Sequence, residues 1–299
     1  GQWETVERAL QGKDTVVLLP TGAGKSIAFQ LSALLLPGRC IVVDPILSLI
    51  DDQIDNLGRV GIDRCIGITS QMRNPVMMDH VIRAFASGQY LFCYVAPERF
   101  QNEKFRNALR VLTVTVPVSL VAIDEAHCVS EWGHDFRTAY LNLGRIARDY
   151  CESSGLAPPL LALTGTASRI VLKDVQREVG ITSDDALITP KTFDRPELEF
   201  VVLRSNSDEK ARRVEGILHG LPTFFGLDRT TFFRPNGDRS YAGLIFCPHV
   251  NGDYGVVRQA AELQATLGMS VECYGGTAPK NFKGNWDEVK RNAARRFKK

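Results

Sequence analysis

The stretch Leu19-Pro-Thr-Gly-Ala-Gly-Lys-Ser26 decides the fold of this chain. It follows an apolar run at 15–19 and precedes a helix-like run at 26–36, so a glycine-rich loop joins a strand to a helix. Gly22 and Gly24 let the backbone turn tightly and approach a phosphate, and the start of the helix adds its positive dipole end. We therefore expect a phosphate-binding loop. The alternative is an ordinary glycine-rich turn between a strand and a helix.

Each residue of this loop has an expected role in holding a nucleoside triphosphate. Lys25 would reach the β- and γ-phosphates of ATP, and the Ser26 hydroxyl would bind Mg²⁺. Successive backbone N–H groups of the loop would point at the phosphates. The expected nucleotide-binding residues of the loop are Thr21, Gly22, Ala23, Gly24, Lys25 and Ser26.

Length and composition set the broad class of the protein. The 299 residues are enough for two α/β domains, and 44% hydrophobic with 23% charged residues is ordinary for a globular protein. A net charge of +2 means that any nucleic-acid surface must be a local patch. The sequence has neither a long apolar run nor a signal-peptide pattern, so we expect an intracellular protein, cytoplasmic or nuclear, with no membrane partner.

The cysteines argue against a structural metal. There are seven of them, an odd number, and no two are spaced as a CxxC pair. Scattered single cysteines indicate reduced thiols, so we expect no zinc in this chain.

The first two thirds of the chain alternate apolar runs with amphipathic segments. The intervening segments are long enough for crossover helices, which predicts an α/β fold with a parallel, doubly wound sheet. The strands are expected at 16–19, 40–44, 90–96, 119–124 and 160–164.

A composition break at 190–196 separates two expected domains, 1–190 and 191–299. The second begins with an extended run at 198–203 and a helix-like segment at 208–218. Residues 220–241 are polar, Gly-rich and aromatic, and we expect a long loop or insertion there. A second α/β unit should then follow, with strands at 243–247 and 270–274, a helix at 256–267 and a last amphipathic helix that carries Trp286, Val289, Ala293 and Phe297 on one face.

An acidic pair follows one of the expected strands. Asp124 and Glu125 come directly after the apolar run at 118–123. Asp124 would hold Mg²⁺ and Glu125 would polarise the attacking water, as in nucleotide hydrolysis. An acidic pair at this position can also serve only to cap the next helix. The glycine loop upstream in the same α/β pattern favours the nucleotide site.

The residues after the acidic pair identify a family resemblance. The segment DEAHCVSEWGHDFR at 124–137 resembles the DEAH box and aromatic-rich loop of the RecQ family of DNA helicases. Gln2 resembles the end of the family's adenine-reading motif. The shorter core PTGxGKS is the form that the glycine loop has in superfamily 2 helicases, and this form tolerates Leu19 in front of it. Further segments that resemble motifs of the family lie at 44–53, 95–99, 162–168, 192–198 and 244–248, although Gly165 stands where the family usually has Ala.

The resemblance implies a motor of two RecA-like domains, with ATP and Mg²⁺ between them, that moves 3′ to 5′ along single-stranded DNA. It adds Gln2 to the nucleotide-binding residues and His127 to the catalytic residues Lys25, Asp124 and Glu125. It also implies contact with single-stranded or forked DNA, or coupling to it, by Ser48, Gln53, Trp132, His134, Phe136, Arg137, Thr164 and Thr166.

The physical chemistry of these side chains supports the roles without excluding simpler ones. Trp132 and Phe136 can stack on bases, and Arg137 can pair with a phosphate. The alternative is that both rings are core anchors beneath a loop. Thr164 and Thr166 could hydrogen-bond the acidic motif or only cap a helix. The basic residues of 280–299 could follow a phosphate backbone, but we favour the solvated face of an amphipathic helix.

The resemblance weakens in the second domain. Gly275-Gly276 stands where the family has a His-Ala pair, and motifs V and VI, with the arginine that completes the ATP site, do not occur in the sequence. We therefore expect an incomplete second domain, a fragment or trimmed chain, and no unwinding by this chain alone. Two alternatives to a DNA helicase in repair, recombination or genome defence stay open: an RNA-remodelling helicase, and a nucleotide-dependent DNA-binding switch with protein partners in a larger assembly.

Overall fold

The computed structural model describes residues 1–69, 75–130, 137–190, 192–194, 198–233, 241–268 and 271–297. Within these ranges the chain divides into two compact units, Gly1–Pro196 and Glu197–Lys299. The first unit is an α/β sandwich, and the described residues of the second are helices and irregular segments.

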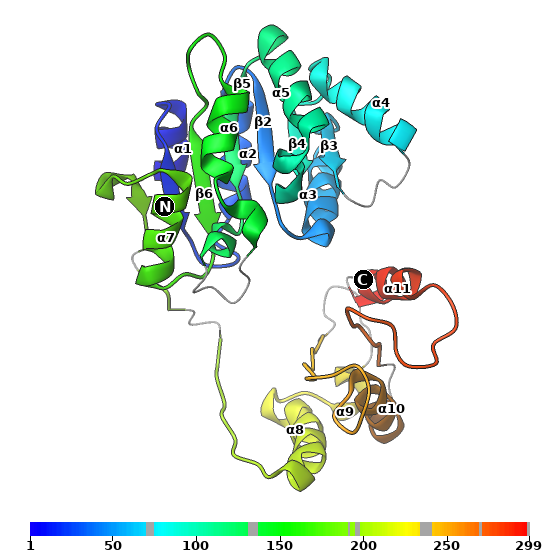
Figure 1. Ribbon diagram of the computed structural model, residues 1–299. Coiled ribbons are helices and arrows are strands. Elements are labelled where there is room, and N and C mark those ends of the chain that lie inside the picture. Colours follow the sequence, from blue (N-terminus) through cyan, green and yellow to red (C-terminus); the bar gives the residue numbers. More distant parts are fainter. Residues whose placement is uncertain are drawn as a thin grey trace. The chain divides into compact units, whose positions relative to one another are not determined.

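The first unit is built on a parallel sheet of seven strands (Figure 1). The spatial order is β3-β4-β2-β5-β6-β1-β7, and every neighbouring pair is parallel. The strands are β1 (Thr15–Leu18), β2 (Arg39–Val43), β3 (Cys65–Ile68), β4 (Phe92–Val95), β5 (Val118–Ile123), β6 (Leu160–Thr164) and β7 (Leu187–Ile188). The α/β class and the parallel sheet are therefore confirmed.

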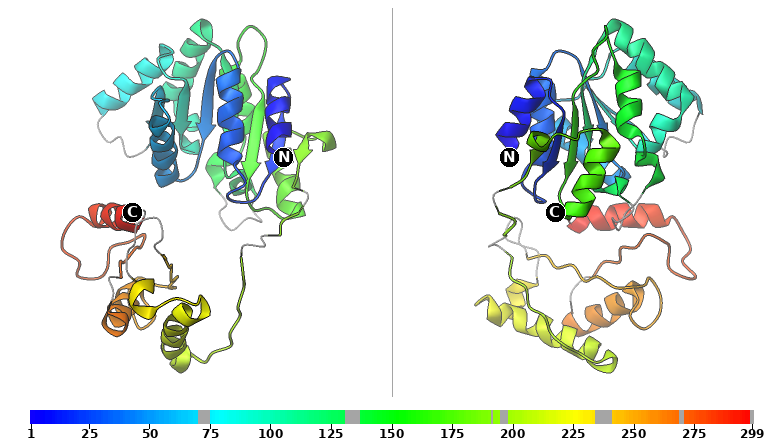
Figure 2. Two further views of the ribbon diagram at one scale, coloured as in Figure 1. Left: turned by 180° about the vertical axis from the view of Figure 1, so that it is seen from behind. Right: turned by 60° about the vertical axis from the view of Figure 1, so that its left-hand side comes forward.

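Helices cover both faces of this sheet, and Figures 1 and 2 show them on opposite sides. One face packs against α1 (Gln2–Leu10), α2 (Lys25–Leu35) and α3 (Leu47–Arg59). The other packs against α4 (Pro75–Ala86), α5 (Glu103–Thr115), α6 (Leu143–Cys151) and α7 (Arg169–Val179). Short 3-10 turns occupy Pro97–Gln101, Ala126–Val129, Thr138–Tyr140 and Asp184–Ala186. The sheet is therefore doubly wound, as the alternation of the sequence predicts.

The strands form where successive residues are all apolar, so that the side chains on both faces of the strand are apolar. All side chains of β1 and β6 are buried, which fits a sheet that is enclosed on two sides. In the first unit, α5 and α7 begin with a side-chain cap, because Asn102 accepts from the Phe105 N–H and Ser168 from the Val171 N–H. The sequence did not predict β3 and β7. β3 includes Gly67, and β7 is only two residues long.

The strand order determines where the functional groups meet. Parallel strands present all their carboxyl ends at one edge, and the central strands run in the order β2-β5-β6-β1. Asp44 follows β2, Asp124 follows β5, Gly165 follows β6, and the glycine loop follows β1. One edge of the sheet therefore gathers residues from four distant parts of the sequence.

The second unit contains four α-helices among its described residues (198–233, 241–268 and 271–297). They are α8 (Lys210–Phe224), α9 (Arg229–Phe232), α10 (Val256–Leu267) and α11 (Trp286–Phe297), with a 3-10 turn at Ser207–Glu209. α10 and α11 lie where the sequence predicts helices. α8 continues through Pro222, so the expected loop at 220–241 begins as helix.

The strands expected in the second unit are not formed by its described residues. The segments 243–247 and 271–274 belong to no ladder, and the side chain of Phe246 is 91% exposed. An apolar run becomes a strand only where a neighbour offers its N–H and C=O groups, and these runs meet none. The described part of the unit has only an isolated bridge between His249 and Gly255.

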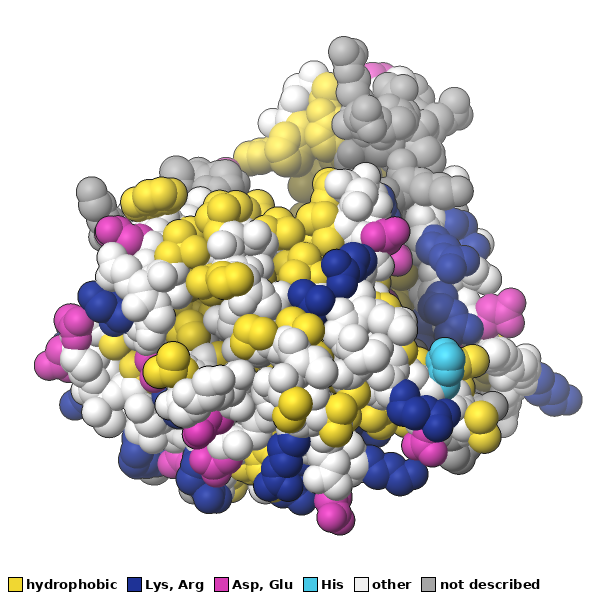
Figure 3. Space-filling view, turned by 90° about the horizontal axis from the view of Figure 1, so that it is seen from above, with side chains coloured by type: hydrophobic (Ala, Val, Ile, Leu, Met, Phe, Trp, Pro, Cys, Tyr) yellow, Lys and Arg dark blue, Asp and Glu magenta, His cyan; other side chains and the backbone are white. Residues whose placement is uncertain are grey.

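The surface carries mixed charge where the space-filling view presents it. Figure 3 shows Lys and Arg side chains interspersed with Asp, Glu and hydrophobic ones, without a broad region of a single charge. This pattern agrees with the small net charge of +2. In the part of the chain that the structure describes, no helix has both the length and the apolar character to cross a membrane.

Candidate nucleotide site

The glycine loop has the backbone that a phosphate cradle requires. Gly22 has φ +82° and Gly24 has φ +76°, which is the left-handed region that favours glycine. Gly24 is also the N-cap of α2, so the helix begins at Lys25. The first free N–H groups of α2 and the positive end of its dipole lie directly after the loop. This geometry suits an anion such as a phosphate.

Gln2 lies against this loop from the start of α1. Its Nε2 donates to the Ala23 carbonyl oxygen at 2.7 Å. A Cβ on Gly24 would collide with the same Nε2, so the glycine also makes room for the glutamine. The amide that the sequence assigns to nucleotide recognition therefore contacts the backbone of the phosphate loop.

The acidic pair lies at the carboxyl end of β5. The Asp124 N–H donates to the Val43 carbonyl at 2.8 Å, which fixes the pair beside the end of β2. The Asp124 carboxyl accepts from the Glu125 N–H at 2.9 Å, and Glu125 has φ +47°. A left-handed non-glycine residue is uncommon and costs about 1–3 kcal/mol, so the packing around it must hold this turn in place.

Burial and neighbouring charges shift the pKa values of Asp124 and Glu125 in opposite directions. Burial raises the pKa of Asp124 to about 6, although the Lys25 ammonium opposes the shift. The hydrogen bond to His127 lowers the pKa of Glu125, and Lys25 lowers it further. Hydrogen bonds with Cys128 and Glu125 raise the pKa of His127 to about 10. Glu125 is therefore ionised at neutral pH, beside a protonated imidazole.

His127 joins the acidic pair to the end of β6. Its Nδ1 lies 3.2 Å from Glu125 Oε2 and 2.9 Å from Thr164 Oγ1. Thr164 Oγ1 in turn contacts the carbonyl oxygen and the N–H of Thr166. These contacts connect β5 to the neighbouring strand that lies beside the phosphate loop.

The oxygen donors of this edge fit a magnesium ion. Mg²⁺ is usually held by one or two carboxylates with substrate phosphates and water rather than by a full set of protein ligands. Ser26 at the start of α2 and the buried carboxyl of Asp124 supply such oxygens. In the described ranges, no group of three or more His, Cys, Asp and Glu side chains could hold a metal by itself. A magnesium site here would therefore depend on a bound nucleotide.

The structure places only some of the residues that are expected to face DNA. Ser48 is exposed on α3, and Gln53 Nε2 points at Asp44 Oδ2 over 3.4 Å. Arg137 donates from Nη1 to the Pro45 carbonyl at 2.9 Å, and its N–H donates to the Cys128 carbonyl. Trp132, His134 and Phe136 lie outside the described residues, so their roles stay predictions.

Two residues of the site have no assigned role in the sequence analysis. Asp44 is fully buried, and burial raises its pKa to about 7, with further contributions from Asp124 and Glu125. Its Oδ1 accepts from the Ile46 N–H. The buried Tyr140 hydroxyl donates to the Asp124 carbonyl at 3.0 Å. An aspartate directly after an apolar strand was a usable signal for Asp44, whereas the sequence carries none for Tyr140.

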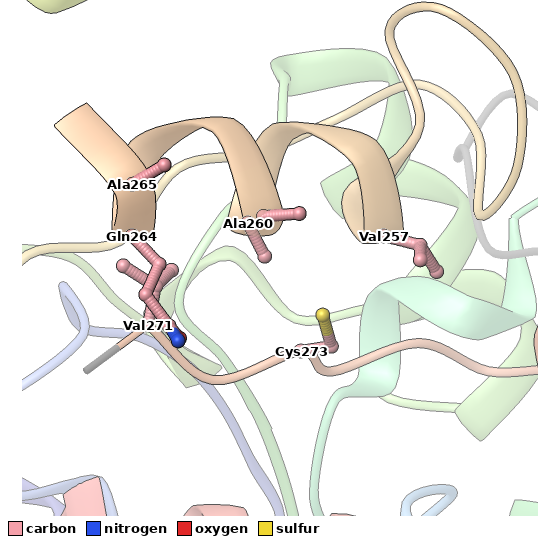
Figure 4. A pocket seen from close by; sticks show the side chains of 7 residues that line it. Val257, Ala260, Gln264, Ala265, Val271 and Cys273 are labelled. Atoms are coloured by element: carbon pink, nitrogen blue, oxygen red, sulfur yellow. The ribbon is translucent and has the colours of Figure 1, made fainter.

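The second unit has a hollow of a different character. About 470 Å³ in volume, it is lined by α10 and by the segment at 271–273, with Val257, Ala260 and Val271 on its walls (Figure 4). Its one titratable lining group is Cys273, whose pKa is raised by burial. A lining of mostly small apolar side chains without a cation does not suit a triphosphate, so this hollow is not a candidate nucleotide site.

Comparison with known proteins gives a consistent result. Residues 1–175 match the DEAD/DEAH box helicase family. The probable ATP-dependent DNA helicase RecS of Bacillus subtilis (strain 168) is 32% identical over 251 residues, which is 83% of this chain and 44% of the relative. The ATP-dependent DNA helicase RecQ of Pasteurella multocida (strain Pm70) is 32% identical over 274 residues, 92% of this chain and 38% of the relative.

Among solved structures, the DUF1998 helicase MrfA aligns with a TM-score of 0.57 at 16% identity, over 93% of this chain and 40% of that one. This likeness shows the fold alone. The chain spans less than half the length of the two curated relatives.

Proposed function

We propose, from the premise that this chain belongs to the DEAD/DEAH box helicase family and carries a RecQ-type core, that it is the motor part of an ATP-dependent DNA helicase. The motor would move 3′ to 5′ along single-stranded DNA, inside the cell, in repair, recombination or genome defence. Its partners would be single-stranded or forked DNA and the proteins of such a complex.

The contact of His127 with both Glu125 and Thr164 carries the proposal. A bare nucleotide-binding protein needs the phosphate loop and the acidic pair, but no link from them to other elements. Here one imidazole nitrogen lies within hydrogen-bond distance of the expected water-polarising acid and of the strand end that follows it. A change at the γ-phosphate would therefore alter the position of β6 and of the loop after it.

The roles of the individual groups follow from their places. The Lys25 ammonium would neutralise charge on the β- and γ-phosphates, which is the main part of phosphoryl-transfer catalysis. Ser26 and Asp124 would hold Mg²⁺, which supplies charge neutralisation at the same oxygens. Glu125, kept ionised by His127, would orient the attacking water. Gln2, already on the loop, would take the base edge.

The DNA-side connection rests on residues that flank the aromatic loop. Ser130 donates to the Asp174 carboxyl on α7 at 2.7 Å, and both side chains are buried. Arg137 is held at Pro45, next to the start of α3. Ser130 and Arg137 are therefore both anchored to other elements of the first unit, which supports the proposed coupling role of Arg137.

The proposal is tested by ATP hydrolysis with and without single-stranded DNA. Stimulation by DNA is expected, and an RNA of equal length should stimulate less. A Trp132→Ala variant should lose most of the DNA stimulation while keeping its ATP affinity, since a stacked base contributes roughly 1–3 kcal/mol. Equal stimulation by RNA would favour the RNA-remodelling alternative. ATP hydrolysis that neither DNA nor RNA stimulates would contradict the motor proposal.

The direction of movement needs a separate measurement. Strand displacement should proceed from a duplex with a 3′ single-stranded tail and fail on the same duplex with a 5′ tail. The longest available form of the protein is the right sample, because the relatives are more than twice as long as the part that this chain matches. Preference for the 5′ tail would reverse the proposed direction.

A further inference from the structure

Tyr140 contacts the acidic pair from a turn that follows the predicted DNA-side loop. It is the last residue of the 3-10 turn at Thr138–Tyr140, and its side chain is 2% exposed. The hydroxyl donates to the Asp124 carbonyl oxygen at 3.0 Å. Burial raises the pKa of this phenol well above its usual value, so the hydroxyl keeps its proton and remains a donor at neutral pH.

This hydrogen bond helps to fix the peptide unit that joins Asp124 to Glu125. The N–H of that peptide donates to the Asp124 carboxyl at 2.9 Å, and its C=O accepts from the Tyr140 hydroxyl. The peptide therefore cannot rotate without breaking one of these contacts. Its orientation matters because Glu125 follows with φ +47°, a left-handed conformation that a non-glycine residue adopts only where its surroundings hold it.

The backbone around Tyr140 is itself anchored to the acidic motif. The Tyr140 N–H donates to the Arg137 carbonyl at 3.0 Å, and the Arg137 N–H donates to the Cys128 carbonyl at 2.9 Å. The tyrosine ring belongs to the same buried apolar cluster as Ala126 and Cys128, which directly follow the acidic pair. The hydroxyl therefore approaches the Asp124 carbonyl from a well-supported turn, as a positioning role requires.

We infer that Tyr140 is a positioning residue for ATP hydrolysis, because its hydroxyl holds the turn at Glu125 and thereby the direction of the Glu125 carboxylate. The inference rests on the proposed function, since it takes Glu125 as the group that orients the attacking water. In the held conformation, this carboxylate lies 3.2 Å from His127 Nδ1. The hydroxyl acts on the backbone of the acidic pair rather than on the phosphate loop. It therefore sets the rate of hydrolysis and not the affinity for nucleotide.

The substitution Tyr140→Phe removes the hydroxyl and keeps the ring. The Asp124 carbonyl then loses its donor, and the peptide can turn to relieve the left-handed conformation of Glu125. The kcat of ATP hydrolysis should fall about tenfold, which corresponds to the loss of one ordinary hydrogen bond. KM and the affinity for Mg·ADP should change less than about twofold, because the interaction is needed only in the chemical step. The loss should be the same with and without single-stranded DNA.

The sample is the longest form of the protein that hydrolyses ATP, and the matched control is Tyr94→Phe. Tyr94 is also a fully buried tyrosine of the first unit, but its hydroxyl accepts from Gln30 Nε2. Its loss should leave kcat unchanged. Replacing Tyr140 by 4-aminophenylalanine keeps the ring and restores an N–H donor, so most of the lost kcat should return. Thermal unfolding identifies a temperature at which every variant is folded, and all rates are measured there.

An unchanged kcat in Tyr140→Phe overturns the inference. An equal loss in Tyr94→Phe also overturns it, because the effect would then come from the stability of the first unit. A matching loss of Mg·ADP affinity would assign Tyr140 to binding, and a loss confined to the DNA-stimulated rate would assign it to coupling; either result contradicts a positioning role in hydrolysis. Failure of the proposed function is distinguishable, because the wild-type protein itself would then hydrolyse no ATP.

Discussion

The two units differ in how their apolar runs are used. In the first unit, every strand has a neighbour, and side chains such as Leu161 and Val17 are fully buried between helices. In the second, comparably apolar segments at 200–203 and 244–246 are exposed and belong to no ladder. Hydrophobicity alone therefore does not make a strand. A parallel sheet needs a set of neighbours that is complete enough to satisfy backbone groups and cover both faces.

The difference extends to chemistry. Residues that follow four adjacent strands converge in the first unit, because parallel strands end at one edge. The described part of the second unit offers a small apolar hollow instead. Nucleotide binding should therefore be lost by changes at this edge of the first unit and be insensitive to changes around the apolar hollow of the second.

The largest expected effect is that of Lys25→Ala. ATP hydrolysis should fall by roughly 10²–10³-fold or more in any length of the protein that hydrolyses ATP, because preorganised charge at the phosphates is the main catalytic contribution. Glu125→Gln should keep nucleotide binding and lose turnover. The matched control is Arg295→Ala, which removes an exposed cation from α11 in the second unit. Hydrolysis that survives Lys25→Ala, or that Arg295→Ala abolishes, would break the contrast between the units.

A smaller effect is expected from truncating the two kinds of apolar residue. Leu161→Ala removes a fully buried side chain from β6, and its free energy of unfolding should fall by about 2–5 kcal/mol. Phe246→Ala removes a larger side chain that is 91% exposed, and the change should stay within about 0.5 kcal/mol. Chemical denaturation followed by circular dichroism measures both. A comparable loss in the two variants would show that the 244–246 segment is packed in solution.

Most of the first unit could be predicted from the sequence for a physical reason. Its central strands are buried on both faces, so they read as continuous apolar runs, and the glycine loop can only join a strand to a helix. β7 could not be predicted because its two residues are too short to show a period. The rule that a continuous apolar run predicts a strand failed at 243–247. That run has no neighbouring strand, and its own residues carry no signal of this.

The residues of the candidate site could be predicted where their type and spacing along the chain indicate their chemistry. Gly22, Lys25, Asp124 and Glu125 are recognisable by spacing and by their place after apolar runs. The hydroxyl of Tyr140 could not be foreseen, because its contact with the Asp124 carbonyl depends on how the chain returns after the acidic motif. The approach of Lys25 and Thr21 to Gly165 likewise depends on how the phosphate loop and the end of β6 meet at the sheet edge.

The smallest expected effect concerns Asp44, which is buried at the site and ionises unfavourably. Burial raises its pKa from 3.8 to about 7, so between these values the folded chain keeps a proton that the unfolded chain releases. The stability that comes from the protonated form is complete at pH values below about 4 and is lost as pH rises through about 7. Asp44→Asn removes this dependence and should raise the free energy of unfolding at pH 8 by about 1–2 kcal/mol, less than the full pKa shift implies because the site relaxes.

The contact between position 44 and Gln53 survives the substitution Asp44→Asn. Gln53 Nε2 lies 3.4 Å from Asp44 Oδ2, and the amide oxygen of an asparagine can accept from the same group. Denaturation of both proteins at pH 4 and pH 8, without Mg²⁺ or nucleotide, measures the difference, and Asp55→Asn on the exposed side of α3 is the control. A gain of equal size at both pH values would assign the effect to something other than ionisation, and no gain at either would contradict the raised pKa of Asp44.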